Sequence, residues 1–498
     1  MAFTLSPGKI QSHGNQFARL LERQEVPERG VVACVLPNCP EFAFALRGIT
    51  WCGRVLTPIN WHLSASDIDY IIENSEADAL LIHSDFSEIA LKICHRIPPQ
   101  FRFSVGGKIE GFSDFEQSLD LPIYELDNPV AGDVMMYTSG TTGRPKGVRR
   151  KSSQAKEQPP PGFHGSAGKA MLLRYLKEES HGAHIVVAPY YHSAPLTYGE
   201  GASLLGADLV IMETWNPEEF LRLVEEHKVA STFLVPTHFV RLLRLPEATR
   251  MRYDLSSLKL IVHGAAPVSP TIKHQMIEWL GPVLFEFYGG TEGGGTSISS
   301  QDWLQHPGSV GKPGPGLYVH ILNEQDEELA AGEIGDIYFS SDISNFEYKA
   351  DAEKTASAYR GNKYTLGDIG YQDEEGYLYL CDRRADTIIT GGVNIFPVQI
   401  EDVLINHPAI AEACVVGILD NEWGEKILAV VELCAGFTEN DPLTAELEKH
   451  CLDNLGTQQM PKAFRYSDKL PRTDTGKILR RQIRDHYRKA FSKRQGND

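Results

Sequence analysis

The stretch Val134-Met-Met-Tyr-Thr-Ser-Gly-Thr-Thr-Gly-Arg-Pro-Lys-Gly147 decides how this chain is interpreted. An apolar strand runs directly into small and hydroxylated residues, which are followed by the cation Lys146. Glycines at 140 and 143 let backbone N–H groups approach a ligand closely. Together with the lysine charge, these groups supply the donors that a polyphosphate requires. The segment therefore predicts a phosphate-binding loop. Its binding residues are Thr138, Ser139, Gly140, Thr141, Thr142, Gly143 and Lys146.

Two common nucleotide-binding loops do not fit this stretch. A Walker A loop needs Gly-Lys-Ser/Thr after its spacer, but position 145 is Pro and Lys146 is followed by Gly. The GxGxxG fingerprint of dinucleotide-binding folds is found nowhere in the chain. A simple Gly/Thr surface turn is the alternative interpretation, and it leaves the hydroxyl run and the lysine unexplained.

The length of 498 residues predicts more than one domain, because single cores stop growing near ~250–300 residues. Short β-branched runs alternate with helical patterns up to about residue 320, which is typical of α/β layering. Short strands and polar turns then predict a small β-rich subdomain, and a new helix–strand pattern follows Arg384. We predict an α/β protein with a large N-terminal domain of layered subdomains, 1–384, and a small α+β C-terminal domain, 385–498.

Composition excludes several classes of protein. The formal charge of −18 disfavours nucleic acid as a partner. The eight cysteines stand at no metal-binding or CxxC spacing, which predicts reduced thiols. The N-terminal sequence lacks the pattern of a secretory signal, and no apolar run approaches the ~20 residues of a membrane-spanning helix. These features predict a cytoplasmic protein without an integral membrane segment, and they leave self-association open.

Three further motifs complete a known pattern. They are Tyr288-Gly-Gly-Thr-Glu292, Tyr364-Thr-Leu-Gly-Asp-Ile-Gly370 and Pro471-Arg-Thr-Asp-Thr-Gly-Lys-Ile-Leu-Arg480. With the phosphate loop, they resemble the adenylate-forming superfamily, which includes acyl-CoA synthetases, luciferases and nonribosomal adenylation domains. The resemblance extends over nearly the whole chain and is greatest to bacterial fatty- or bile-acid-type CoA ligases. It implies a mobile C-terminal domain and an active site between the two domains.

The resemblance assigns a nucleotide site. A carboxylate just past a strand end and beside a phosphate loop can hold Mg²⁺, and this role falls to Glu292. The resemblance implies that Thr291 bonds the α-phosphate, that Asp368 accepts the ribose hydroxyls and that Arg383 contacts ribose or phosphate. The implied adenine pocket consists of Gly264, Ala265, Ala266 and the ring of Tyr288.

The remaining implied roles concern catalysis and the second substrate. Lys477 is the implied catalytic lysine, since its charge can offset the negative charge of the transition state. Gly391 and Gly392 would line a tunnel for the pantetheine arm of coenzyme A, and His192 would gate the acyl pocket. The basic C-terminal tail is interpreted as a solvated helix face, with contact to CoA phosphates as the alternative.

Three positions depart from the family pattern. Leu366 stands where Thr is usual, Asp382 stands where Gly is usual, and Ala385 stands at the hinge position that is most often Asp or Lys. Ala385 lacks the side-chain contacts that accompany domain rotation, although backbone torsions can still absorb the movement. These departures bear on the second half-reaction.

The implied activity is an ATP-dependent acid–thiol ligase, which needs ATP, Mg²⁺ and CoA. A carboxylate would attack the α-phosphorus of ATP, pyrophosphate would leave, and a thiol would then attack the acyl-adenylate. Five glycines beside Glu292 predict room for a bulky or long acyl group; they are Gly289, Gly290, Gly293, Gly294 and Gly295. Three alternatives stay open: transfer to a carrier protein or an amine, activation of nitrite to diazotise an aryl amine, and a nonenzymatic nucleotide-binding module.

Overall fold

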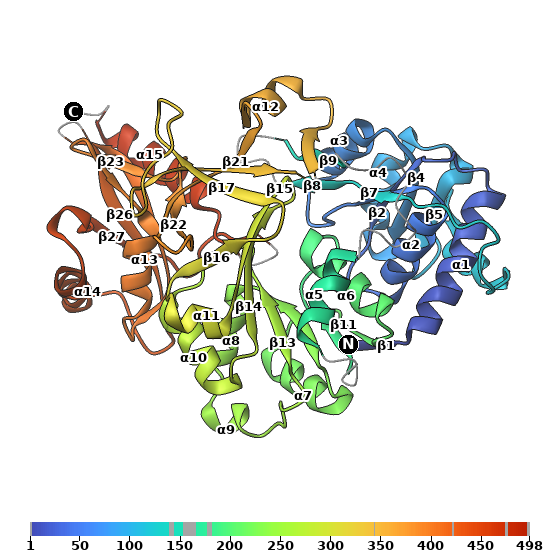
Figure 1. The fold of residues 1–498 in the computed structure, drawn as a ribbon, viewed down its shortest axis with the longest axis horizontal. Coiled ribbons are helices and arrows are strands. Elements are labelled where there is room, and N and C mark those ends of the chain that lie inside the picture. The colour runs from blue at the N-terminus through green and yellow to red at the C-terminus, as the bar shows by residue number, and fades with distance from the viewer. Residues whose placement is uncertain are drawn as a thin grey trace.

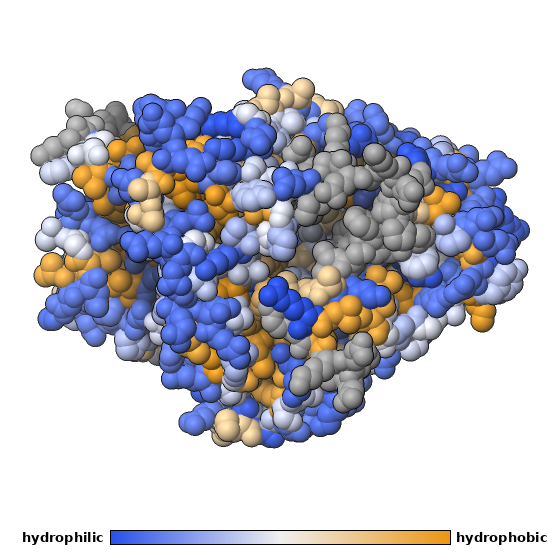
Figure 2. Space-filling model, in the orientation of Figure 1, coloured by the Kyte–Doolittle hydropathy of each residue, from blue (hydrophilic) through white to orange (hydrophobic). Residues whose placement is uncertain are grey.

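The computed structural model describes residues 2–138, 144–152, 166–176, 182–342, 344–420, 423–473 and 477–495. In these residues the strands form four sheets, and helices lie between and around them (Figure 1). The predicted α/β class is confirmed, with a large N-terminal domain and a small C-terminal one. Hydrophilic residues cover most of the face shown in Figure 2, in keeping with the charged composition.

The first sheet is parallel throughout, with the order β6-β5-β4-β2-β3-β7. A parallel sheet is covered on both faces, and accordingly every residue of β2 is buried. Its strands are β2 (Val31–Val35), β3 (Val55–Pro58), β4 (Ala77–His83), β5 (Arg102–Val105), β6 (Ser113–Asp114) and β7 (Asp133–Val134). The helices of this part are α1 (Pro7–Arg23), α2 (Pro40–Trp51), α3 (Ala65–Ser75) and α4 (Ser87–Ile93).

The second sheet begins as an α/β sheet and continues as an antiparallel one. Strands β11, β10, β12, β13 and β14 pair in parallel, whereas β1 adds to one edge in the antiparallel sense. These strands are β1 (Ala2–Leu5), β10 (His184–Val186), β11 (Leu209–Met212), β12 (Ser231–Leu234), β13 (Leu260–His263) and β14 (Leu284–Gly290). Their helices are α5 (Ser166–Tyr175), α6 (Ser193–Leu204), α7 (Pro217–His227), α8 (Pro236–Leu243), α9 (Glu247–Arg250), α10 (Pro270–Leu280) and α11 (Ser300–Gln305).

The β-rich part that the sequence predicts near residue 320 is not a separate sheet. Its antiparallel strands extend the second sheet through β14–β15 and β15–β16 pairing, in the order β15-β16-β22-β21-β18-β17. They are β15 (Gly293–Ser299), β16 (Ser309–Pro313), β17 (Leu317–Leu322), β18 (Gly335–Ser341), β20 (Tyr359–Arg360), β21 (Lys363–Gln372) and β22 (Leu378–Arg383). Helix α12 (Ala352–Ser357) precedes β20, and a third, antiparallel sheet consists of β8 (Met136–Thr138), β9 (Lys146–Ser152) and β19 (Ser344–Tyr348).

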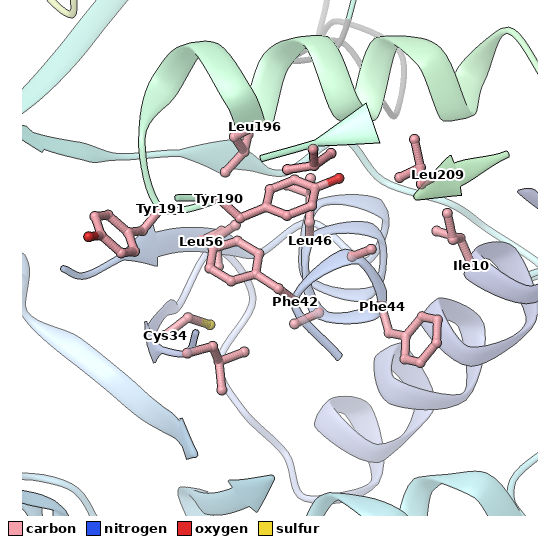
Figure 3. Close-up of a cluster of buried hydrophobic side chains, with 14 of the residues drawn as sticks. Ile10, Cys34, Phe42, Phe44, Leu46, Leu56, Tyr190, Tyr191, Leu196 and Leu209 are labelled. Atoms are coloured by element: carbon pink, nitrogen blue, oxygen red, sulfur yellow. The ribbon is translucent and has the colours of Figure 1, made fainter. Parts of the chain in front are cut away.

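A polar and aromatic joint holds the first two sheets together. The side-chain amide of Asn38 donates to the carbonyls of Ala188 and Met212, at 3.2 and 3.1 Å, and its oxygen accepts the N–H of Tyr190 at 2.8 Å. The Tyr190 ring stacks on Phe42 of α2, with ring centroids 5.1 Å apart. Figure 3 shows these two rings within one apolar cluster, to which α2, α6 and β11 contribute side chains. The segment that leads into α6 is therefore fixed in place.

The C-terminal part has its own sheet and core. Strands β23 (Ile388–Thr390), β24 (Val393–Ile395), β25 (Ile410–Asp420), β26 (Gly424–Leu433) and β27 (Ala463–Tyr466) pack with α13 (Pro397–Ile405) and α14 (Asp441–Asn454). The helix–strand pattern predicted after Arg384 is confirmed, and the hairpin of β23 and β24 precedes its first helix. We propose that the domain boundary falls at residues 384 and 385, between β22 and β23.

The last helix, α15 (Arg480–Gln495), corrects the interpretation of the basic tail. Arg480 forms a two-pronged pair with Glu401, at 2.7 and 2.9 Å, and Arg488 pairs with Glu425. These side chains neutralise acidic groups of the same domain, so for them the prediction of a solvated face is wrong. Among the described residues, no helix is both long and apolar enough to cross a bilayer.

Candidate active site

The predicted phosphate loop connects two paired strands. Thr138 ends β8 and Lys146 begins β9, and the two residues are register partners in the antiparallel pair. The strands thus bring both ends of the loop to one place. The predicted residues Ser139, Gly140, Thr141, Thr142 and Gly143 lie outside the described residues.

The hairpin from β14 to β15 carries Thr291 and Glu292 at its tip. Gly290 and Gly293 are register partners, so Thr291 and Glu292 form the two-residue connection. The Tyr348 hydroxyl on β19 donates to Oε1 of Glu292 at 3.0 Å, and the Lys146 ammonium lies 5.4 Å from the centroid of the same tyrosine ring. Burial, with the neighbouring Lys354, lowers the pKa of Lys146, whereas Glu292 acts in the opposite direction. The carboxylate and the lysine are therefore close enough to share one polyphosphate.

A second cluster joins the strands β14, β21 and β22. The Tyr288 hydroxyl donates to Oδ2 of Asp368 at 2.6 Å, and the Arg383 Nε lies 3.3 Å from Oδ1 of the same carboxylate. Asp368 and Arg383 are register partners on adjacent strands. Burial and the adjacent Asp368 charge raise the pKa of Tyr288, so its hydroxyl stays protonated and donates. Three residues that were predicted separately thus form one hydrogen-bonded group.

The predicted adenine-pocket segment lies beside this group. Gly264 follows β13, whose last residues pair with Phe285 and Glu286 of β14. A Cβ at Gly264 would lie 2.5 Å from the carbonyl oxygen of Phe287, so only glycine fits there. Ala265 has a φ of +70°, a conformation that side-chain-bearing residues adopt uncommonly. The close backbone approach holds Gly264, Ala265 and Ala266 against the strand that carries Tyr288.

Lys477 of the C-terminal domain interacts electrostatically with the same cluster. Its backbone N–H donates to the Thr473 hydroxyl at 3.1 Å and its carbonyl accepts the Thr473 N–H at 2.7 Å. Although the residue as a whole is exposed, crowding by protein atoms desolvates the ammonium, and with Arg383 this lowers the pKa of Lys477 to about 8. Asp368 attracts the ammonium and opposes this shift. The charge of Lys477 in one domain is thus felt by the hydrogen-bonded group of the other.

Three of the predicted residues lie elsewhere. His192 caps the start of α6 with its ring against Tyr191, and burial lowers its pKa to about 4, so it is neutral at pH 7. Gly391 and Gly392 form the exposed turn between β23 and β24, where a Cβ at Gly391 would lie 2.8 Å from the Trp423 ring. Figure 1 places β23 at the outer side of the C-terminal domain, far from β14 and β15.

The glycines beside Glu292 do not leave an open wall. A Cβ at Gly293 would lie 2.8 Å from the Tyr364 hydroxyl, and one at Gly294 would lie 3.1 Å from the Phe339 ring. At Gly290 the nearest atoms are those of Glu292 and Leu366, while Gly289 and Gly295 face backbone carbonyl oxygens. These glycines therefore do not make the room for a large acyl group that the sequence predicted, because protein atoms lie within 3.3 Å of each Cβ position.

The three departures from the family pattern have structural explanations. Leu366 packs in the apolar cluster beside Gly290, and the neighbouring Thr365 supplies the hydroxyl that accepts the Gly367 N–H at 2.9 Å. The carbonyl of Ala385 accepts a bond from Arg484 of α15 at 2.7 Å, so the proposed hinge is tied through its backbone. Asp382 is buried and bonds backbone groups on both sides of the proposed boundary.

Sequence reasoning did not find the buried ion pair that supports this site. Lys273 of α10 and Glu286 of β14 approach to 2.5 Å, and both are almost inaccessible to solvent. The ring of His263, the last residue of β13, lies 4.0 Å from the same carboxylate. Burial raises the pKa of Glu286 and lowers those of Lys273 and His263. The sequence does contain one sign of this pair. Glu286 stands two residues before Tyr288 in an otherwise apolar run, and a buried carboxylate needs a partner.

Comparison with known proteins identifies the family. The AMP-binding enzyme model matches residues 3–346, and the model of the AMP-binding enzyme C-terminal domain matches residues 399–477. The chain belongs to the AMP-binding enzyme family. It is an adenylate-forming enzyme of the acyl-CoA and acid ligase group, and the resemblance inferred from the motifs is confirmed.

This AMP-binding enzyme has relatives that cover nearly its full length. A long-chain-fatty-acid–CoA ligase of Bacillus subtilis is 29% identical over 91% of this chain and 84% of the relative. The fatty acid–[acyl-carrier-protein] ligase ScoC of Streptomyces coeruleorubidus is 27% identical over 97% and 92% of the two chains. The structure of o-succinylbenzoate CoA synthetase from B. subtilis with its acyl-adenylate superposes with a TM-score of 0.78, at 26% identity over 96% and 92% of the chains.

Proposed function

We propose that this protein is an ATP-dependent acyl-CoA ligase, which adenylates a bulky or long-chain carboxylic acid and transfers the acyl group to coenzyme A. The observation that carries the proposal is the electrostatic interaction of Lys477 with Asp368 and Arg383, which pair with each other at 3.3 Å. Adenylation needs cationic groups at the centre where carboxylate and phosphate charges meet. Here the C-terminal domain supplies one such group to a site that the N-terminal domain builds.

In the first half-reaction, the N-terminal domain would hold ATP. Asp368 would accept the ribose hydroxyls, and Tyr288, fixed by its bond to Asp368, would present its ring to the adenine beside Gly264–Ala266. Thr138, Lys146 and the loop between them would bind the phosphates, with Thr291 at the α-phosphate. Pyrophosphate departs as the acid oxygen bonds to the α-phosphorus, and Lys477 would offset the charge that gathers there.

The residues at the hairpin tip fit a magnesium site. Glu292 offers carboxylate oxygens at a partly exposed turn, Tyr348 orients one of them, and hard oxygen ligands are those that Mg²⁺ prefers. The other ligands would be phosphate oxygens and water, since no group of three metal-binding side chains occurs in the described part of the chain. When bound, the ion supplies positive charge against the polyphosphate.

In the second half-reaction the C-terminal domain would rotate about Ala385. Lys477 would leave, and the Gly391–Gly392 turn, now at the outer side of the domain, would come to line the thiol path. His192 would stand at the acyl side, and its neutral ring suits an apolar acyl chain. The long-chain or bulky substrate is supported by the similarity to the long-chain ligase of B. subtilis.

Transfer to an acyl carrier protein is the second candidate. Its support is the ScoC relative, which is similar over almost the whole chain. AMP formation would be measured with fatty, bile and aryl acids, each with no acceptor, with CoA or with a phosphopantetheinylated carrier protein. An amine acceptor and nitrite with an aryl amine complete the panel. Acid-dependent AMP formation that CoA accelerates supports the proposal, whereas acceleration only by another acceptor assigns that acceptor instead.

A further inference from the structure

A buried carboxylate joins the two sides of the proposed domain boundary. Asp382 lies on β22 and is 8% exposed. Its Oδ1 accepts the N–H of Arg383 at 2.7 Å, and its Oδ2 accepts the N–H of Val398 at 3.2 Å. Arg383 precedes the boundary and Val398 follows it. One side chain thus bonds the last strand of the N-terminal domain and the first helix of the C-terminal domain.

The bond to Val398 meets a need of helix α13. The first N–H groups of a helix have no partner inside it, and Phe396, the N-cap residue of α13, makes no side-chain capping bond. A carboxylate is favoured at a helix N-terminus, and charge-assisted bonds are the stronger ones. Asp382 therefore caps α13 from outside its own domain.

Neighbouring contacts hold the same arrangement. Arg480 of α15, which is fixed by Glu401, attracts the Asp382 carboxylate. Phe396 packs with Ile369 and Cys381 in a small buried cluster that spans the boundary. The rotation about Ala385 in the proposed function would move α13 and α15 but leave β22 behind. It would therefore break the Asp382–Val398 bond and these contacts.

We propose that Asp382 is a positioning residue, which latches the C-terminal domain in the orientation that brings Lys477 to Asp368 and Arg383. The proposal rests on the proposed function, because the latched orientation is the one that serves adenylation. The bond from Asp382 to Val398 thus favours the first half-reaction and must be released for the second.

The latch makes a directional prediction about the two half-reactions. Removing the carboxylate in Asp382→Gly lowers the free-energy difference between the two orientations. Formation of palmitoyl-CoA from supplied palmitoyl-AMP should rise between about threefold and tenfold, where tenfold corresponds to ~1.4 kcal/mol. Palmitate-dependent ATP–pyrophosphate exchange should stay the same or fall. Asp382→Asn, which keeps one oxygen acceptor but loses the charge, should show a smaller change in the same direction.

A matched control removes a carboxylate whose ion pair lies entirely within the C-terminal domain. Glu412 bonds Arg472 at 2.8 Å within the C-terminal domain, and its side chain is 18% exposed. Glu412→Gln should therefore change the two half-reactions by the same factor or not at all.

The orientation itself can be measured without any substrate acid. Spin labels at Leu304→Cys on α11 and Leu452→Cys on α14 report the distance between domains, after Cys94 and Cys434 are replaced by Ser. Pulsed electron–electron resonance should give one narrow distance for the otherwise unchanged chain and for Glu412→Gln. Asp382→Gly should add a second population.

The two outcomes separate the latch from the proposed function. A distance distribution that is identical in the parent chain and Asp382→Gly, or an equal change in both half-reactions, overturns the latch while the ligase activity stands. Absence of turnover with every acid would contradict the proposed function, and the distance measurement would still decide whether Asp382 holds the domain.

Discussion

Among single substitutions outside the nucleotide site, we expect Lys273→Met to lower the free energy of unfolding most. Methionine has nearly the same length as lysine and keeps the apolar stem in place, but it removes the ammonium. In the parent chain that ammonium lies 2.5 Å from Glu286, and the two side chains are 0 and 7% exposed. The substitution therefore leaves a buried carboxylate without its cation.

The size of the effect follows from this geometry. Two unit charges at 2.5 Å attract by about 7 kcal/mol at an effective dielectric constant of 20. Desolvation of both groups offsets part of this, and removal of one partner from a buried pair typically costs about 3–5 kcal/mol. We predict a loss in that range for Lys273→Met. The double variant Lys273→Met/Glu286→Gln should recover most of it, because no buried charge is left unpaired.

The loss should depend on pH. Burial raises the folded-state pKa of Glu286, and loss of the lysine raises it further, so the carboxyl group protonates more readily in the folded variant. An acid with a raised folded-state pKa destabilises the fold when it is ionised and ceases to do so as the pH falls. The stability gap between Lys273→Met and the parent chain should therefore shrink from pH 8 to pH 5.

Urea unfolding provides the assay. Trp303 lies next to the pair, with the Lys273 ammonium 4.7 Å from its ring centroid, so its fluorescence reports the transition of this region. A double-mutant cycle over Lys273 and Glu286 isolates their coupling. A loss of unfolding free energy below about 1 kcal/mol for Lys273→Met, or additive effects in the cycle, would refute the reasoning. A buried unpaired charge destabilises a fold by more than that.

Four further predictions concern the nucleotide site. Lys477→Ala should lower ATP–pyrophosphate exchange on the order of a hundredfold or more, with palmitoyl-CoA formation from supplied adenylate retained; equal loss in both assays contradicts the role. Because the pKa of Lys477 is about 8, exchange should fall as pH rises through 8, and Lys477→Arg should retain its own activity to higher pH. Tyr348→Phe, which frees Glu292, should raise the Mg²⁺ concentration for half-maximal exchange about threefold. Asp368→Asn should raise the KM for ATP about tenfold with a smaller effect on kcat, and a pure kcat loss would place Asp368 elsewhere.

Local sequence patterns predicted the elements well, because helix starts and buried strands have local signals. The helices Pro217–His227 and Pro270–Leu280 are examples, since proline favours the first helical turn and an apolar face follows it. The hairpin-tip position of Thr291 and Glu292 follows from the glycines on either side. The motifs that lie far apart in the chain correctly indicated the family, which the family models confirm.

Long-range pairings could not be predicted in the same way. The partnership of Tyr348 with Glu292 depends on a small sheet that joins β8, β9 and β19. The Lys273–Glu286 pair joins a helix to a strand, and the spacing of either residue gives no sign of the other. The glycines near Glu292 were misinterpreted because a missing side chain leaves room only where no other chain segment fills it. Likewise, the sequence contains no sign of the carboxylates that pair with Arg480 and Arg488 of α15, because Glu401 and Glu425 lie far from them in the chain.

The central claim is that this site joins a carboxylate to the α-phosphate of ATP, and ATP–pyrophosphate exchange tests it most directly. The exchange would be measured with Mg-ATP and labelled pyrophosphate, without CoA, against the panel of fatty, bile and aryl acids. We predict exchange that requires both Mg²⁺ and one class of acid. Nucleotide binding without exchange for any of these acids would contradict it.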